Sequence, residues 1–331
     1  MRSPEPPAPP RPGRRTGVRF LAGATAVAVV MAFTMVGVQM WGAPVQPESE
    51  AHPDVTASTR PNSIRAAERP ERNRGTTASP SPLPTPADPG PRGWELPERV
   101  WEPLPPLVAS NEDWVALQTS PVHDLAPATL VDCPEPSIVR DIDSYRAQVR
   151  EQWSCVHAAW IPVYEALGWS TVEPAVEFYP GKGSKSECGY LEAPAFYCSA
   201  GAGTVYFGGD HQVMAGRWDL SVNEMVNHEY GHHIQSLAGI TGAKQRVSGP
   251  DDIERRSELQ ATCWSAMMTY NNRSFDFDQQ DYDSWLMRLD TMLVDGVHGS
   301  RESLRYWGVR GLYAVTLGDC NTWAVEAQYV S

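Results

Sequence analysis

The pattern of apolar and polar positions divides the chain into distinct parts. Phe20–Trp41 contains no charged side chain and is long enough to cross the hydrocarbon core of a membrane as a helix, which needs about 20 apolar residues. Residues 43–106 hold too few apolar side chains to offset the entropy of ordering them. The pattern therefore predicts a basic N-terminal segment at 1–19, a transmembrane anchor at 20–42, a linker at 43–106 and one folded domain at 107–331.

Within the domain, the apolar periodicity changes from that of a helix to that of strands and back. A long amphipathic helix is predicted at Ile138–Leu167, and Pro162 should kink it or end it. Short runs rich in Val, Tyr and Phe then predict strands. The predicted strands are Val176–Tyr179, Ala195–Cys198 and Thr204–Phe207, and the predicted later helices are Leu220–Leu237, Asp251–Tyr270, Asp281–Val294 and Ser300–Ala314. A helix, a small sheet and further helices predict an α+β domain.

Charge fixes the expected orientation of the apolar span. Five arginines precede it, and the first acidic residue after it is Glu48. The positive-inside rule then places residues 1–19 in the cytoplasm and the rest of the chain outside. A cleaved signal peptide is the alternative, but its apolar region would be about 7–15 residues long and would end in a small-x-small site. The span is longer and its exit, QMWGAP, is a poor cleavage site, which favours an uncleaved anchor. Both interpretations place the domain outside the cytoplasm.

Composition supports the division and excludes one class of function. Of the 30 prolines, 21 precede residue 107, as expected for an extended linker. Near the end of this linker, Trp94 and Trp101 are candidates to pack onto the domain. The formal net charge is −13 for the chain and −15 for residues 107–331. A domain this acidic lacks the excess of positive charge that binds the phosphate backbone of nucleic acids, so we expect no nucleic-acid partner.

All six cysteines lie in the domain, and an even number in an exported segment indicates disulfides. Cys188 and Cys198 are close enough in sequence to close a hairpin-sized loop. Beyond this, six cysteines allow fifteen pairings. No C-x-x-C pair is present, so neither a zinc ribbon nor a thioredoxin-like site is indicated.

The candidate chemistry lies in the predicted helix Leu220–Leu237, in the sequence His228-Glu229-Tyr230-Gly231-His232. Histidines four residues apart share one helical face, so both imidazoles can reach one zinc ion. Glu229 would lie beside the metal, where it can take a proton from a zinc-bound water and pass it to a leaving amine. A pair of histidines on a solvated helical face is the alternative interpretation.

A catalytic zinc takes three protein ligands and keeps one open position. Glu258, on the predicted helix Asp251–Tyr270, is the candidate for the third ligand, and Glu254, one turn earlier, competes with it. His157 is off the apolar stripe of its helix and is expected to be a surface or packing residue. His233 lies about 100° around the helix from His232, which predicts a supporting or surface role.

Five blocks of sequence lie over about residues 175–323, in this order: ECGYLEAPAFYCSAGAGTVYF, NHEYGHHIQ, SELQATCW, HGSRESLRYWGVRGL and DCNTW. In sequence and in order they resemble the neutral zinc metallopeptidase family of bacterial envelope proteins, whose third zinc ligand is a glutamate. The resemblance implies a zincin-like fold and peptide hydrolysis.

The resemblance also implies roles for individual residues. It gives His228, His232 and Glu258 as zinc ligands and Glu229 as general base. It implies the disulfides Cys188–Cys198 and Cys263–Cys320, which leaves Cys133 with Cys155. His298 matches a recurring His-Gly of the family and is a candidate to polarise the scissile carbonyl, with a capping or packing role as the alternative.

One position departs from the family pattern. The family usually has aspartate four residues after the glutamate ligand, where this chain has Thr262. Such an aspartate orients a zinc-bound histidine, and loss of a partner of this kind typically costs about 10–100-fold in metal affinity or activity. The sequence thus predicts a membrane-anchored zinc endopeptidase acting on proteins or peptides outside the membrane. A weakly active or inactive zincin-fold binding protein of the cell envelope is the alternative.

Overall fold

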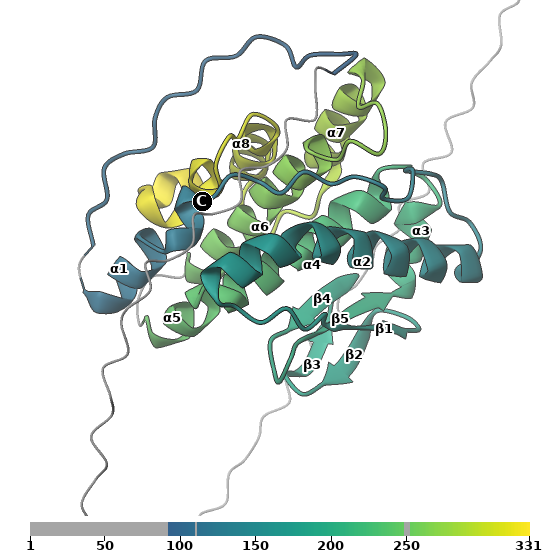
Figure 1. The fold of residues 1–331 in the computed structure, drawn as a ribbon, viewed down its shortest axis with the longest axis horizontal. Coiled ribbons are helices and arrows are strands. Elements are labelled where there is room, and N and C mark those ends of the chain that lie inside the picture. Colours follow the sequence, from purple (N-terminus) through teal and green to yellow (C-terminus); the bar gives the residue numbers. More distant parts are fainter. Residues whose placement is uncertain (1–91, 110, 248–251) are drawn as a thin grey trace, which may run out of the picture. The chain divides into compact units, whose positions relative to one another are not determined.

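The computed structural model describes residues 92–109, 111–247 and 252–331. The predicted segments 1–19 and 20–42 and most of the linker lie outside these ranges. Within them, no helix has both the length and the apolar character that crossing a membrane requires. The described chain is an α+β domain, as predicted, with small sheets beside a layer of helices (Figure 1).

The longest helix, α2, spans Ile142–Leu167 and crosses the other helices (Figure 1). Asp141 caps its start by accepting a hydrogen bond from the backbone N–H of Ser144, and Gly168, in the left-handed conformation, ends it. The helix therefore starts four residues later than predicted and continues beyond Pro162. The buried stripe extends on both sides of this proline, including Trp160 and Tyr164. Packing thus outweighs the hydrogen bond that the proline removes.

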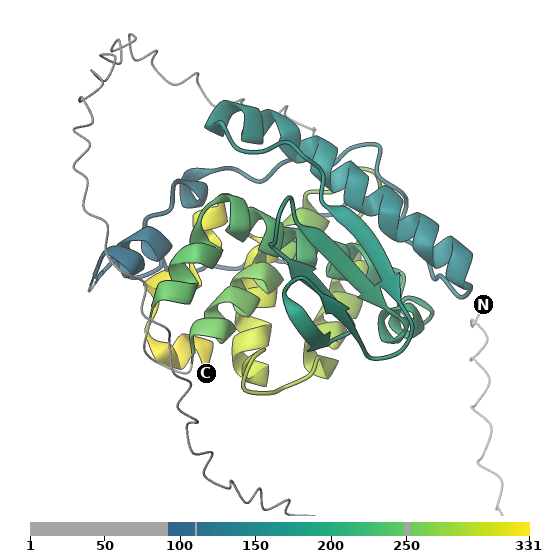
Figure 2. The ribbon, with the colours of Figure 1, turned by 90° about the horizontal axis from the view of Figure 1, so that it is seen from below.

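The three predicted strands are present and form one mixed sheet. Strand β5 (Thr204–Gly208) lies in the centre, parallel to β1 (Ala175–Tyr179) and antiparallel to β4 (Ala195–Cys198). A separate hairpin of β2 (Gly183–Ser186) and β3 (Gly189–Glu192) was not predicted. Every residue of β3 is exposed, so the hairpin has no apolar alternation to detect. Figure 2 shows the strands on one side of the helices.

The later helices pack side by side, with α6 (Ile253–Tyr270) between α4 (Ser221–Leu237) and α8 (Arg301–Leu312) (Figure 1). Their ends lie within three residues of the predicted ends, as do those of α7 (Gln279–Thr291). The short helices were not predicted, since seven residues give little periodicity. They are α1 (Glu112–Gln118), α3 (Gly209–Ala215) and α5 (Ile240–Arg246), with 3-10 turns at Pro121–Asp124, Leu317–Cys320, Thr322–Ala324 and Ala327–Val330.

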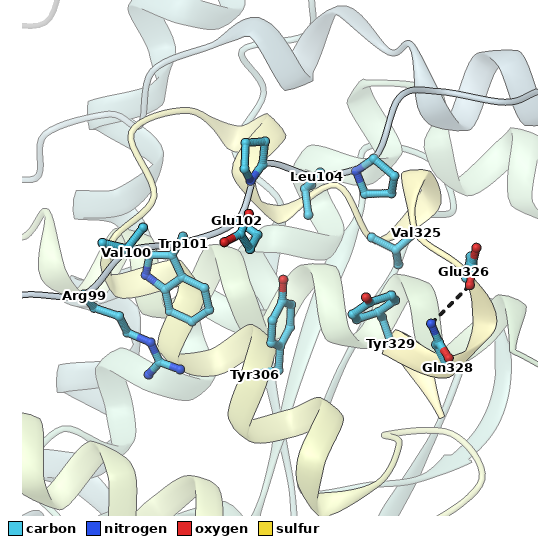
Figure 3. Close-up of a pocket in the computed structure, with 12 residues that line it drawn as sticks. Arg99, Val100, Trp101, Glu102, Leu104, Tyr306, Val325, Glu326, Gln328 and Tyr329 are labelled. Carbon is cyan, nitrogen blue, oxygen red and sulfur yellow. Dashed lines mark hydrogen bonds between the residues drawn. The ribbon is translucent and has the colours of Figure 1, made fainter.

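The described end of the predicted linker lies against the domain. The ring of Trp94 is 5.8 Å from that of Tyr282, and the ring of Trp101 is 5.5 Å from that of Tyr306, between centroids. Both tryptophans therefore pack as the sequence suggested. A cavity of about 500 Å³ lies between this segment, Tyr306 and Tyr329 (Figure 3). None of the residues that line it carries the candidate chemistry described above.

The three disulfides that the family resemblance implied are present: Cys133–Cys155, Cys188–Cys198 and Cys263–Cys320. No cysteine among the described residues is free, and all six are described. Disulfides form and persist in oxidising compartments. The structure therefore indicates a domain that lies outside the cytoplasm.

Two buried histidines make the fold sensitive to acid. Burial lowers the pKa of both His123 and His211 to about 4. A histidine that folds in its neutral form contributes stability above its unfolded pKa of about 6.5, and this contribution is lost as pH falls toward the folded pKa. We therefore expect the free energy of unfolding to decrease between pH 6.5 and 4, by up to about 3 kcal/mol for each histidine.

Denaturant unfolding of the full chain and of a His211→Gln variant at several pH values tests this expectation. In the native protein His211 accepts from the Tyr145 hydroxyl and bonds the Ser221 carbonyl, two roles that a glutamine amide can fill. The variant should lose less stability on acidification. An unchanged slope would show that burial does not lower the pKa of His211 in the folded state.

Candidate metal centre

Two histidines and a glutamate converge between helices α4 and α6. His228 and His232 lie one turn apart on α4, and the Nε2 atoms of both face Oε2 of Glu258, at 3.2 and 3.4 Å. One donor atom from each residue lies within 4.8 Å of the other two, which is a group able to hold a metal ion. The structure thus brings together the three residues that the sequence suggested as ligands.

Close helix packing brings Glu258 to the histidines. Gly231, inside the histidine motif, lies against Ala261 of α6, where a Cβ atom at position 231 would stand only 3.3 Å from the Ala261 Cα. Glycine therefore lets the two helices approach at the level of the site. Buried hydrogen bonds fix their register: the Asn227 amide donates to the Thr269 hydroxyl at 2.9 Å. These contacts place Glu258 opposite both histidines.

The competing candidate, Glu254, does not reach the site. Its carboxylate pairs with the Lys244 ammonium at 2.7 Å, and its side chain is 59% exposed. One helical turn thus separates a surface ion pair from the inward-facing carboxylate of Glu258.

Glu229 lies beside this group and is buried. Its Oε2 has no hydrogen-bond partner among the described residues. Burial raises the pKa of Glu229, whereas the charges of His228 and His232 act in the opposite direction. Tyr179 of β1 is close enough that the charge of Glu229, after the larger effect of burial, raises the pKa of this phenol. A buried carboxylate with one unpartnered oxygen is suited to accept a proton from a small molecule.

The charges within the group are strongly linked. Burial tends to raise the pKa of Glu258, but the charge of His232 and hydrogen bonds from both histidines hold it well below its usual value. Burial lowers the pKa of His232, but Glu258 raises it to about 9. The carboxylate is therefore ionised and able to bind a cation, which would replace a proton on His232.

The donor set fits zinc. Two imidazole nitrogens and one carboxylate oxygen form one of the three-ligand sets that catalytic zinc takes, with the fourth position open. The unpartnered Oε2 of Glu229 borders the same group, as expected for a site that also holds water. His228, His232 and Glu258 would hold the ion.

His298 lies near the centre but is not one of the three converging residues. Its Nδ1 is 3.0 Å from both carboxylate oxygens of Asp295, and its side chain is 39% exposed. Its charge acts to lower the pKa of Glu229, against the larger effect of burial that raises it, so the two groups are close enough to interact. Ser300, not His298, caps α8. The capping alternative for His298 is therefore wrong, and its role toward substrate stays a prediction.

The other two histidines considered in the sequence are packing residues. His157 bonds the Tyr230 hydroxyl through Nδ1 at 3.0 Å, and His233 bonds the Tyr197 hydroxyl through Nδ1 at 2.9 Å. Both side chains are buried, so the surface alternatives for them are wrong.

The residue that contacts Nδ1 of His232 was not among the predicted site residues. Among the described residues, no hydrogen bond joins Thr262 to either histidine, although Thr262 is buried. Instead, Nδ1 of His232 is 2.9 Å from Oε1 of Gln235. Gln235 follows His232 by three positions on the same helical face, and this spacing was the available signal.

Comparisons with known proteins give a distant match and no assigned function. No family model matches the chain, and no solved structure matches it. The chain is similar to the uncharacterized protein Mb2605 of Mycobacterium bovis and to the uncharacterized protein Rv2575 of Mycobacterium tuberculosis, each 32% identical over 123 residues. The match covers 35% of this chain and 40% of each relative. The chain therefore has distant, partial homology to uncharacterized mycobacterial proteins.

Proposed function

We propose that the protein is a zinc-dependent endopeptidase. The observation that carries the proposal is the convergence of His228, His232 and Glu258 beside the buried Glu229. A purely structural zinc site is usually closed by four protein ligands, whereas this group supplies three. A structural zinc site also has no use for a buried carboxylate such as Glu229, whose Oε2 has no hydrogen-bond partner among the described residues.

In the proposed mechanism, the protein side chains position and move one proton. Zinc, when bound by the three ligands, supplies a Lewis acid that acidifies water and polarises a carbonyl. Oε2 of Glu229 takes a proton from the attacking water, and Glu229 then gives that proton to the leaving amine. Burial raises the pKa of Glu229 above its usual value, which favours its acting first as a base and then as an acid.

We place this activity outside the cytoplasmic membrane. The three disulfides support an oxidising compartment, and the basic segment 1–19 followed by the apolar span 20–42 supports a single anchor with a cytoplasmic N-terminus. Residues 43–91 would then separate the anchor from the domain. The substrates would be proteins or peptides that reach the outer face of the cytoplasmic membrane.

Zinc content and peptide cleavage test the proposed function directly. The full chain should bind about one zinc ion per molecule and cleave members of a peptide library, and chelation should stop cleavage. Glu258→Ala removes one of three ligands, so we expect it to lose both zinc and activity. Elemental analysis after dialysis measures the first and a library digest the second. Cleavage that persists in zinc-free protein would contradict the proposal.

One observation favours a second function. Thr262 offers neither histidine a charged partner, and a weakened site would suit a binding protein built on the same fold. In that case zinc would be bound fully, no peptide would be cleaved, and chelation would lower only the melting temperature.

A further inference from the structure

Gln235 uses all of its hydrogen-bonding capacity in a buried position next to the candidate metal centre. Its side chain is 1% exposed. Its Oε1 lies 2.9 Å from Nδ1 of His232 and accepts from the Ser257 hydroxyl at 2.9 Å. Its Nε2 donates to the Ser257 carbonyl at 2.9 Å and to Oε1 of Gln260 at 3.0 Å. A glutamine amide has two acceptor and two donor positions, so none is left over.

The partners fix which way this amide faces. A backbone carbonyl such as that of Ser257 only accepts, so the atom of Gln235 that faces it must be the N–H₂ group. The opposite orientation would bring two oxygens together in a buried place. The oxygen of Gln235 therefore faces His232.

The hydrogen bonds of Gln260 support this orientation of the Gln235 amide independently. The indole N–H of Trp323 only donates, and it bonds Oε1 of Gln260 at 3.1 Å. The Gln260 amide nitrogen must then donate to Nε2 of His123, at 3.1 Å. His123 is consequently neutral there and carries its proton on Nδ1, 3.2 Å from the Gln118 carbonyl oxygen. All hydrogen bonds of this network are consistent with the orientation in which Oε1 of Gln235 faces His232.

This orientation decides the protonation of His232. Because Oε1 of Gln235 can only accept, Nδ1 of His232 must carry a hydrogen. The lone pair available for a metal is then on Nε2, the atom that faces Glu258. The tautomer and the ring plane that a metal needs are thus set by protein groups alone.

We propose that Gln235 is the positioning residue of His232 and takes over the task that an aspartate at position 262 would perform. A neutral amide replaces the carboxylate, and its oxygen is held by Ser257 and, through its nitrogen, by Gln260. The inference rests on the proposed zinc site, since a positioned Nε2 has its purpose in holding the ion. Gln235 itself touches neither metal nor substrate.

Zinc affinity of the full chain, measured by competition with a chelator of known affinity, tests the inference without any activity assay. Gln235→Met keeps the side-chain size and removes the acceptor, so zinc affinity should fall by about 10–100-fold. Gln148→Met is the matched control: it removes a buried glutamine that donates to the Glu135 carbonyl and accepts from the Ser137 hydroxyl, outside the network that holds Gln235.

The two readouts separate positioning from general support of the fold. If Gln235 positions His232, only Gln235→Met weakens zinc binding, while the melting temperatures of both zinc-free Met variants fall. Equal zinc affinities of Gln235→Met and wild type would overturn the inference, and so would equal losses in the two Met variants. A wild-type chain that binds no zinc would overturn the proposed function along with it, whereas normal zinc binding in Gln235→Met would overturn only the role of Gln235.

Discussion

Glu229→Gln is expected to lower peptide hydrolysis by about 10²–10⁴-fold, the usual contribution of general acid–base catalysis, while zinc remains bound. The amide has the size of the carboxylate but cannot take a proton from water. Glu229 is not among the three converging donors, so the ion keeps its ligands. The measurements are kcat/KM on a peptide found in the library digest and zinc content on the same preparation.

Glu254→Gln is the matched control, because it makes the same chemical change at an exposed glutamate that pairs with Lys244. Its kcat/KM should equal that of wild type. If Glu229→Gln cleaves as fast as wild type, the carboxylate is not the general base and the mechanism is wrong. If neither wild type nor variant cleaves any peptide while both hold zinc, the binding-protein alternative is correct.

The sequence predicted the long elements and the two histidines of the candidate metal centre because each has a local signal. The helix that carries His228 and His232 shows apolar periodicity, and the four-residue spacing of the histidines by itself places them on one face. Glu258 was harder, because spacing alone did not separate it from Glu254. The family resemblance favoured Glu258, and the packing of Gly231 against Ala261 shows why that turn of α6 faces the site.

The support around the site could not be predicted because it depends on residues far apart in the chain. Gln235 contacts Gln260, and Gln260 contacts His123 and Trp323, which are 137 and 63 positions away. No local pattern marks such a network. The sequence suggested that Trp101 packs onto the domain, but no local signal marks Tyr306, far along the chain, as its partner.

Loss of the Cys263–Cys320 disulfide is expected to cost the largest amount of stability of any change to the fold considered above. The bond joins residues 57 positions apart, and closing a loop of that size lowers the entropy of the unfolded chain by an amount worth about 4 kcal/mol. Both cysteines are fully buried, and Cys263 lies on α6 in the turn after Glu258. The double variant Cys263→Ala/Cys320→Ala should therefore unfold at much lower denaturant concentration.

The Cys188→Ala/Cys198→Ala variant provides the comparison. That bond closes a loop of only 10 positions between the exposed β2–β3 hairpin and β4, so the same argument gives a loss of about 3 kcal/mol. Denaturant unfolding of both variants and of wild type, without zinc, measures which disulfide contributes more to the free energy of unfolding. Because α6 carries Glu258, the first variant should also bind zinc more weakly. Equal losses of stability in the two variants would show that loop size does not govern the contribution of a disulfide. Unchanged zinc binding in Cys263→Ala/Cys320→Ala would show that α6 holds Glu258 in place without this disulfide.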